Sequence, residues 1–289
     1  MAERSARGQA TNAQRDPAPT LMAPRFSDEP PDIARSPDGV PALTVQLLDG
    51  FRLWVGPNAV SNLPVGKVGS LLKLLLLQRG HPVSRSRLCA LYWPDADPAD
   101  ARNNLNVSLH RIRRLLGPAA QLQFSDDAYR LHVVGQVWLD AEQFEQLAEQ
   151  GAREEGRIRL DAALLAYDAA AQLYQTDLLA ELGTDPALTP WCQALRGRLS
   201  QVLTRLAALH ETSADYHSCL RAALRSLTLD ECNEEAHRQL MRCYARLHQP
   251  QEAERQYRRC VSVLRLQLGL APSDTTTALY RQLAMRLAA

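Results

Sequence analysis

The sequence contains no long hydrophobic run. No apolar stretch approaches the roughly 20 residues that a membrane-spanning helix needs, and the longest candidate, residues 71–77, is interrupted by Lys73. The first forty residues hold no apolar segment of the kind that forms the centre of a secretory signal. We therefore expect a cytoplasmic protein with no membrane partner, whose six cysteines stay reduced.

The sequence also lacks the motifs of common catalytic sites. It has no CxxC, no HExxH and no GxSxG, so neither a zinc site nor a hydrolase nucleophile is indicated. The nearest approach to a phosphate-binding loop is residues 66–67, Gly-Lys. Ser61 stands where that motif requires glycine, and Val68 stands where it requires a hydroxyl residue. We expect no enzyme and no cofactor.

The cysteines show no spacing suited to a metal, and we interpret them as small hydrophobic core residues. His210, His217 and Cys219 lie within ten residues of one another and keep a metal site open as the minor alternative. Asp215 alone does not complete a ligand set for it, so we expect no metal.

Charge is distributed unevenly along the 289 residues, although the net charge is only +1. Residues 61–117 carry nine Lys or Arg against three acids, whereas residues 137–289 carry 17 basic and 20 acidic groups. A chain of this length suits two domains. The basic part is the one that a polyanion would bind.

Composition and pattern divide the chain into three parts. Residues 1–40 contain six prolines and little apolar periodicity, which predicts a disordered tail. Residues 41–136, which include the basic part, predict a DNA-binding domain. Residues 137–289 predict a helical domain.

Short strands and three helices are indicated between residues 43 and 134. Residues 43–55 form two strand-like runs around Asp49-Gly50, a dipeptide that favours a tight hairpin in a small antiparallel sheet. Three segments with helical spacing follow. The first covers 65–79, the second is capped by Ser84 and ends at Trp93-Pro94, and the third covers 100–116. Residues 122–134 alternate as a hairpin, with Tyr129, Leu131 and Val133 on one face and Arg130 and His132 on the other. This order of elements is that of a winged helix-turn-helix.

The helix over 100–116 has two contrasting faces at about 100° per residue. One narrow sector holds Ala101, Leu105, Leu109, Ile112 and Leu116. The opposite side holds Asn103, Val107, His110 and Arg114, with Asn106, Arg113 and Arg111 on its shoulders. Asn, Arg and an apolar side chain are the groups that read adenine, guanine and the thymine methyl in the major groove.

From residue 139 onward the pattern is almost wholly helical, starting with Asp140 as the N-cap of a helix over 141–150. Helical segments follow over 159–179 and from Trp191 to Leu209. An offset of 34 residues then superposes small and aromatic positions, His210 on Tyr244 and Cys219 on Ala253 among them. This period is typical of TPR-like helical hairpins, which stack and bind other polypeptides. The fold class is therefore mainly α: an N-terminal winged helix-turn-helix with small antiparallel β-sheets, followed by an all-α TPR-like helical-repeat domain.

The chain resembles the SARP type of bacterial transcriptional regulator, in which an OmpR-type winged helix precedes a bacterial transcriptional activation domain. The segments that carry the resemblance are LCALYWPD at 88–95, ARNNLNVSLHRIRRLLG at 101–117, YRL at 129–131, AHRQLMRCYA at 236–245, QYRRC at 256–260 and LGLAPS at 268–273. Together they span most of residues 42–289. The resemblance implies a sequence-specific DNA-binding activator that inserts the helix over 100–116 in the major groove of double-stranded DNA. It also implies that the helical domain contacts RNA polymerase, a neighbouring protomer on repeated DNA sites, or both.

The candidate DNA-binding residues fall into four groups. Base contact is favoured over phosphate contact or plain surface for Asn103, Asn106, His110 and Arg114, with Val107 beside them. Phosphate contact and a solvated or ion-paired role stay open for Arg111 and Arg113. Arg130, near the tip of the predicted hairpin, is a candidate for phosphate or minor-groove contact, and the alternative is an exposed strand arginine. Arg85 and Arg87 open the second helix, where backbone N–H groups suit a phosphate, although Arg87 has Asp95 and Asp97 as alternative partners.

A second hypothesis comes from a different class of protein. In it the chain is a helical-repeat interaction adaptor whose winged helix has weak or lost DNA binding. Exposed residues of the helix over 100–116 discriminate between the two, because their replacement impairs DNA binding only in the first.

Overall fold

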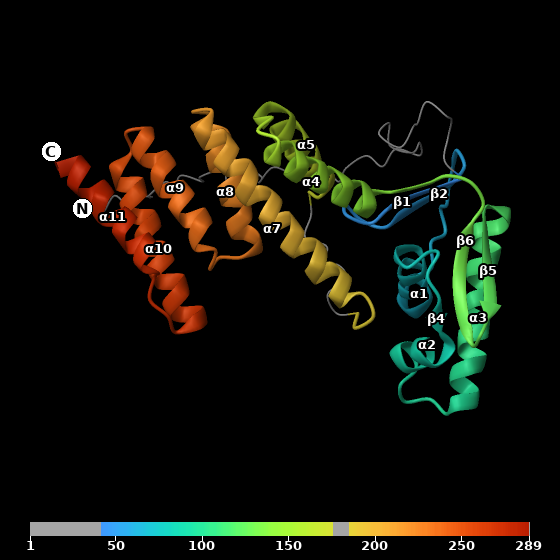
Figure 1. Ribbon diagram of the computed structural model, residues 1–289. Helices are drawn as coiled ribbons and strands as arrows, with labels where there is room; N and C mark the ends of the chain where they lie inside the picture. Colours follow the sequence, from blue (N-terminus) through green and yellow to red (C-terminus); the bar gives the residue numbers. More distant parts are fainter. Residues whose placement is uncertain (1–41, 176–184, 289) are drawn as a thin grey trace, which may run out of the picture.

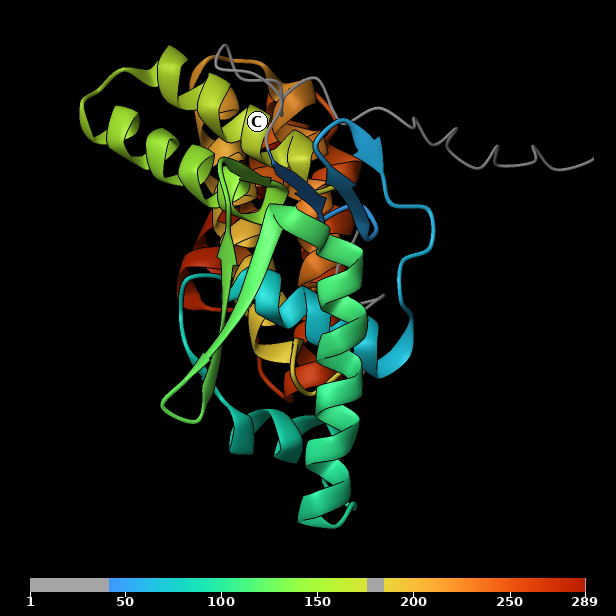
Figure 2. The same cartoon turned by 90° about the vertical axis from the view of Figure 1, so that its right-hand side faces the viewer.

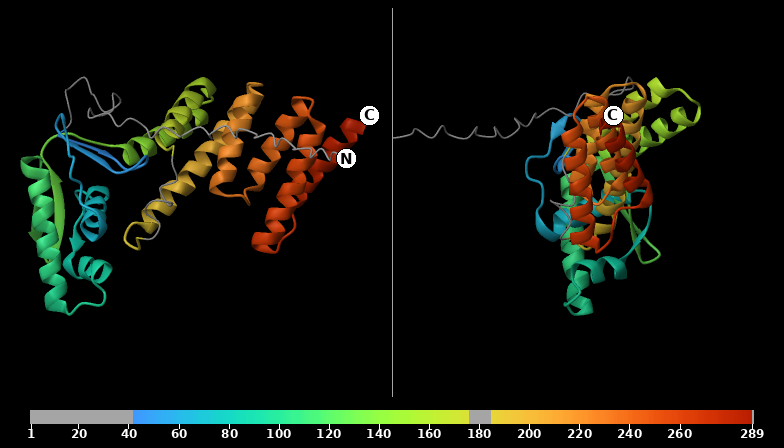
Figure 3. Two further views of the ribbon diagram at one scale, coloured as in Figure 1. Left: turned by 180° about the vertical axis from the view of Figure 1, so that it is seen from behind. Right: turned by 90° about the vertical axis from the view of Figure 1, so that its left-hand side faces the viewer.

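The computed structural model describes residues 42–175 and 185–288, drawn in colour in Figure 1. The expected tail over 1–40 lies outside the described residues. A small part with sheets and three helices occupies one end of the molecule, and the remaining helices stand side by side in a row that leads away from it (Figures 1 and 3). The mainly helical fold expected from the sequence is confirmed.

The first sheet has the strand order β3-β2-β1-β7. Its strands are β1 (Leu43–Gln46), β2 (Arg52–Val55), β3 (Asn58–Ala59) and β7 (Val137–Leu139). The first three pair antiparallel, as expected, but β7 pairs parallel to β1, with Thr44 opposite Trp138. The expectation of purely antiparallel sheets is wrong here, because the partner strand is supplied from some 90 residues further along the chain.

The tight hairpin expected at Asp49-Gly50 does not form. Five residues, 47–51, separate β1 from β2, and Leu47 and Leu48 turn into the core. Their backbone N–H groups donate to Asp140 Oδ2, each at 2.7 Å. In a two-residue turn the N–H groups of Leu47 and Leu48 would not reach the Asp140 carboxylate. The wider loop therefore forms, because it satisfies both buried donors.

Three helices follow, as expected. They are α1 (Gly66–Leu77), α2 (Arg85–Tyr92) and α3 (Pro98–Leu116). Ser84 caps α2, since its Oγ accepts the N–H of Arg87 at 3.3 Å. The helix α3 begins two residues earlier than its sequence pattern indicated, with Pro98 in its first turn, where a missing N–H costs nothing.

The second sheet is the wing, with the order β4-β6-β5. Its strands are β4 (Val83–Ser84), β5 (Ala120–Ser125) and β6 (Ala128–Val133). Asp126 and Asp127 connect β5 to β6, both with positive φ, as a two-residue hairpin requires. Tyr129 and Leu131 are buried while Arg130 and His132 are exposed, which confirms the expected alternation.

The helical row consists of stacked hairpins. Its helices are α4 (Asp140–Gly156), α5 (Leu160–Leu173), α7 (Thr189–Thr212), α8 (Tyr216–Leu229), α9 (Glu234–Arg246), α10 (Pro250–Leu268) and α11 (Asp274–Ala288). Three hairpins turn in the same way, with Ile158, Ala214 and His248 in the left-handed region two positions before the second helix. Ala214 and His248 are 34 residues apart, the period found in the sequence.

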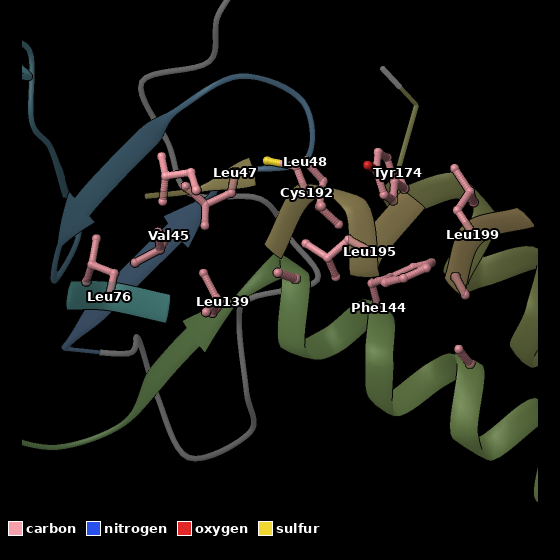
Figure 4. Close-up of a cluster of buried hydrophobic side chains, with 14 of the residues drawn as sticks. Val45, Leu47, Leu48, Leu76, Leu139, Phe144, Tyr174, Cys192, Leu195 and Leu199 are labelled. Atoms are coloured by element: carbon pink, nitrogen blue, oxygen red, sulfur yellow. The ribbon is translucent and has the colours of Figure 1, made fainter. Parts of the chain in front are cut away.

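One continuous core joins the two parts. Leu48 of the β1–β2 loop and Leu139 of β7 meet Phe144 of α4 and Leu195 of α7 (Figure 4). Tyr174 packs edge-on against Phe144, with ring centroids 5.5 Å apart. At the same junction the guanidinium of Arg79 forms a two-bond ion pair with Glu142. The orientation of the helical row relative to the winged helix is therefore fixed by packing and not by a linker.

Asp140 belongs to this junction and not to a helix cap. It is the first residue of α4, with Leu139 in the N-cap position, and its carboxylate also accepts the N–H of Ala141 at 2.8 Å. The expected N-cap role is therefore wrong. The carboxylate instead holds the β1–β2 loop against the start of α4.

Candidate nucleic-acid interface

The helix α3 is held by one face. Its buried residues are Ala101, Leu105, Ser108, Leu109, Ile112 and Leu116. Five of these form the narrow apolar sector expected from the sequence, and the sixth, Ser108, satisfies its hydroxyl by donating to Asn104 O at 2.8 Å. The face packs on α1, α2 and β5, so α3 is fixed along its length while its other side meets solvent (Figure 2).

The solvent side of α3 presents every residue that was expected there. The exposed positions are Asn103, Asn106, Val107, His110, Arg111, Arg113 and Arg114. Val107 keeps 47% of its surface exposed, which is high for an aliphatic side chain in the middle of a helix. Arg113 donates a 3.4 Å hydrogen bond from Nη2 to Leu122 O. Polar, cationic and apolar groups thus share one open helix face.

The start of α2 lies beside the wing because β4 pairs with β6. Arg85 is half-buried there, forms a 2.5 Å ion pair with Asp127, and places its guanidinium 5.5 Å from the Phe124 ring centroid. Arg87 is exposed and forms no ion pair within the described ranges 42–175 and 185–288, including with Asp95 or Asp97. Both arginines lie in the first turn of α2, but their interactions differ. Arg85 is ion-paired with Asp127 of the wing, whereas Arg87 has no ion pair within the described residues.

The wing carries charges of both signs. Its tip consists of Asp126 and Asp127, of which Asp127 is neutralised by Arg85. Arg130 is exposed on β6 opposite Gln123, three positions beyond Asp127. Arg130 of the wing therefore lies on β6, whereas the two aspartates lie at the tip.

Tyr129 connects the wing to α3. Its side chain is only 5% exposed, its ring lies 4.7 Å from that of Phe124, and its hydroxyl donates to Oδ1 of Asn106 at 3.3 Å. Burial raises the pKa of Tyr129, so the hydroxyl keeps its proton and remains a donor. The sequence pattern favours Asn106 as a base reader over phosphate contact or plain surface, and it gives no indication of this contact with Tyr129.

Arg102 is a candidate that sequence reasoning missed. It is exposed in the first turns of α3 and, together with Arg85 and Trp93, lines a cavity of about 480 Å³ between α2, the α2–α3 loop and the wing tip. Cys89 lies in the same cavity, where burial raises the pKa of its thiol more than Arg85 and Arg102 lower it. The charge count of residues 61–117 included Arg102, but only the folded loop brings it next to Arg85.

Ion pairing differs between the two parts of the molecule. Within the described residues, six arginines of the winged helix have no ion pair: Arg87, Arg102, Arg111, Arg113, Arg114 and Arg130. Arginines of the helical row are largely paired with glutamates, as in Arg198–Glu145, Arg205–Glu155, Arg238–Glu235 and Arg242–Glu211. Free positive charge is thus concentrated on and around α3.

A groove of about 840 Å³ lies between α4 and α7. Ala148, Ala152 and Gly156 contribute its apolar lining, and the ion pair of Glu155 with Arg205 stands at its edge. Tyr167 donates to the same Glu155 at 3.1 Å. The charges at this groove therefore neutralise one another, unlike those on α3.

His210 and Cys219 of the alternative metal site have other partners. His210 Nδ1 lies 3.6 Å from Asp215 Oδ2, while Cys219 Sγ lies 2.8 Å from Cys243 Sγ in the core. The hydrogen bond with the Cys243 thiol, together with burial, raises the pKa of Cys219. No group of three metal-ligating His, Cys, Asp or Glu side chains occurs in the part of the chain that the structure describes. In that same part, no helix is both long and apolar enough to cross a membrane.

Comparisons with known proteins agree with this architecture. Residues 139–284 match the family model of the bacterial transcriptional activator domain. The transcriptional regulatory protein MoaR1 of Mycobacterium bovis is 26% identical over 234 residues, which cover 78% of this chain and 75% of MoaR1. The transcriptional regulatory protein EmbR of Mycobacterium tuberculosis is 25% identical over 224 residues, which cover 75% of this chain but only 57% of EmbR.

A solved structure shares the fold. That structure is of Mycobacterium tuberculosis EmbR in complex with a low affinity phosphopeptide, and it superposes with a TM-score of 0.73 at 20% sequence identity. The superposition covers 85% of this chain and 66% of the other, so both the winged helix and the helical row have counterparts there.

Proposed function

Because the chain belongs to the bacterial transcriptional activator domain family and is a SARP-type transcriptional regulator, we propose that it binds DNA sequence-specifically through α3 and acts as an activator. The division at residue 136 into a DNA-binding and an activation domain, as expected from the sequence, is part of this proposal. So is a non-enzymatic role that needs no cofactor, exercised in the cytoplasm where bacterial DNA resides.

One observation carries the proposal: unpaired cations surround an open helix face that also presents Asn103, Val107 and His110. Amide, imidazole and aliphatic groups are chemically suited to base edges in the major groove, which is about 12 Å wide and admits a helix. Exposed arginines without internal partners are suited to phosphates. A solvated helix face with no ligand would more commonly pair its charges, as the helical row does.

Within this proposal the groups have different tasks. Asn103, Val107, His110 and Arg114 face the bases from the centre of the helix face, and Arg111, Arg113 and Arg130 contact phosphates. Arg87 and Arg102 add phosphate contacts at the start of α2 and of α3. Arg85 acts indirectly, since Asp127 already holds it.

The helical row is the proposed contact for RNA polymerase and for a second protomer on repeated sites. Its core is continuous with that of the winged helix, so a partner bound to α4–α11 has a defined position relative to the DNA. This rigidity favours recruitment over a flexible tether.

A panel of full-length variants tests the proposal on a duplex selected by the wild-type protein. Arg114→Ala is expected to weaken binding about tenfold or more and to relax base preference at one position. Arg111→Ala is expected to weaken binding to all duplexes alike and to reduce the salt slope by about 1. Arg258→Ala, which removes an arginine paired with Glu254 on α10, is the matched control and should change neither property.

The interaction adaptor is the competing outcome of the same panel. If Arg114→Ala and Arg111→Ala bind DNA as the wild type does, α3 is not the reading element and the proposal fails. If all proteins bind only weakly and without base preference, the adaptor hypothesis takes its place.

A further inference from the structure

Asn106 and Tyr129 meet where the wing crosses α3. The Tyr129 hydroxyl, on β6, donates to the side-chain oxygen of Asn106 at 3.3 Å. Asn106 remains exposed on the DNA-facing side of α3. A residue in position to touch a base is thus already bonded to the wing.

The hydroxyl of Tyr129 is held in place by a chain of contacts. Tyr129 is 5% exposed, and its ring packs 4.7 Å from Phe124. The Phe124 ring is covered by the guanidinium of Arg85 at 5.5 Å, and Arg85 is held by Asp127 at 2.5 Å. Because Tyr129 is buried and packed against Phe124, its hydroxyl imposes an orientation on the exposed side chain of Asn106 more than it adapts to it.

The direction of the hydrogen bond decides what Asn106 shows to DNA. The Tyr129 hydroxyl donates to Oδ1 of Asn106, and burial keeps Tyr129 protonated and so able to donate. The amide carries its oxygen and its NH2 group on opposite sides of Cγ. With the oxygen turned to Tyr129, the NH2 group is directed away from the wing.

We propose that Tyr129 is a positioning residue that makes Asn106 a reader of guanine. Guanine presents two acceptors, N7 and O6, in the major groove, and the two N–H donors of a held amide suit them. Adenine presents the acceptor N7 and the donor N6, for which an unrestrained asparagine uses its oxygen and its NH2 together. The bond to Tyr129 opposes that two-bond adenine contact. This inference rests on the proposed DNA-binding function and deepens it.

Selection from random duplex DNA tests the inference with four full-length proteins. Asn106→Ala loses preference at one base position and so identifies the position that Asn106 reads. At that position the wild type is expected to favour guanine over adenine about tenfold. Tyr129→Phe, which keeps the ring but removes the donor, is expected to lose or reverse that preference at this position alone. Tyr244→Phe, in the helical row, should leave the motif unchanged.

A further variant covers the case in which Tyr129→Phe folds poorly. Asn106→Gln displaces the amide by one methylene from the position in which Tyr129 holds it and changes only an exposed side chain, so it is expected to favour adenine. The inference is overturned if the wild type favours adenine at this position, if Tyr129→Phe recovers the wild-type motif, or if it weakens all positions equally. A wild-type protein that selects no motif instead overturns the proposed function itself.

Discussion

The carboxylate of Asp140 accepts the backbone N–H of Leu48 at 2.7 Å, across 92 positions of sequence. It accepts the N–H of Leu47 at the same distance, and the side chain is 2% exposed. One acid therefore joins the β1–β2 loop of the winged helix to the first residue of the helical row.

Burial gives this acid a pH-dependent effect on stability. Desolvation raises the pKa of Asp140 from 3.8 to about 6, against the opposing effect of its three backbone donors. Because the folded protein holds this proton more tightly than the unfolded chain, the contribution to the free energy of unfolding is complete below about pH 4. It is lost as the pH rises towards and through 6, and its size is about 3 kcal/mol.

Urea unfolding of the wild type and Asp140→Asn between pH 4 and pH 7 measures this effect. Between pH 4 and pH 7 the free energy of unfolding of the wild type is expected to fall, relative to that of Asp140→Asn, by up to about 3 kcal/mol. The reason is that the amide of Asn does not ionise. Asp161→Asn, at the start of α5, is the control for loss of one carboxyl. Parallel curves for all three proteins would show that Asp140 is already ionised at pH 4.

The close approach of α4 to α5 depends on a glycine. A Cβ on Gly151 would lie 2.5 Å from two ring carbons of Tyr167, whereas a Cβ on Gly197, within α7, would meet no atom within 4 Å. We expect Gly151→Ala to lower the free energy of unfolding by about 1–3 kcal/mol. Gly197→Ala should raise it by up to about 1 kcal/mol, because alanine restricts the unfolded chain and favours helix. Equal effects of the two substitutions in thermal or urea unfolding would contradict the packing described.

The turn between α4 and α5 contains a β-branched residue in a strained conformation. Ile158 has a φ of 61° and is 83% exposed, so its side chain adds little packing to offset the strain. Ile158→Gly is expected to stabilise the protein by about 1 kcal/mol, and Ile158→Ala by less. Differential scanning calorimetry checks both. A fall in melting temperature for the glycine variant would mean that the Ile158 side chain has a stabilising contact.

The sequence predicted the elements whose information is local. The 3.6-residue pattern of α3 identified its buried face, Ser84 marked the start of α2, and alternation around Tyr129 identified the wing. Each of these depends on residues within one or two turns of the chain.

Long-range partners explain what the sequence did not predict. The parallel pairing of β7 with β1 and the open β1–β2 loop both depend on residues near 140, about 90 positions away. The candidate site shows the same limit: the exposure of Asn106 followed from helix geometry, but the contacts of Asn106 with Tyr129 and of Arg85 with Asp127 require the folded wing.

The proposed function requires that α3 reads a DNA sequence. The most direct measurement is the affinity of the full-length protein for a duplex that it selects from a random pool, compared with a shuffled duplex, both at about 0.15 M salt. We expect the protein to bind the selected motif at least about 10³-fold more tightly than the shuffled duplex. Equal affinities for the two duplexes, disappearing together as salt is raised, would contradict it.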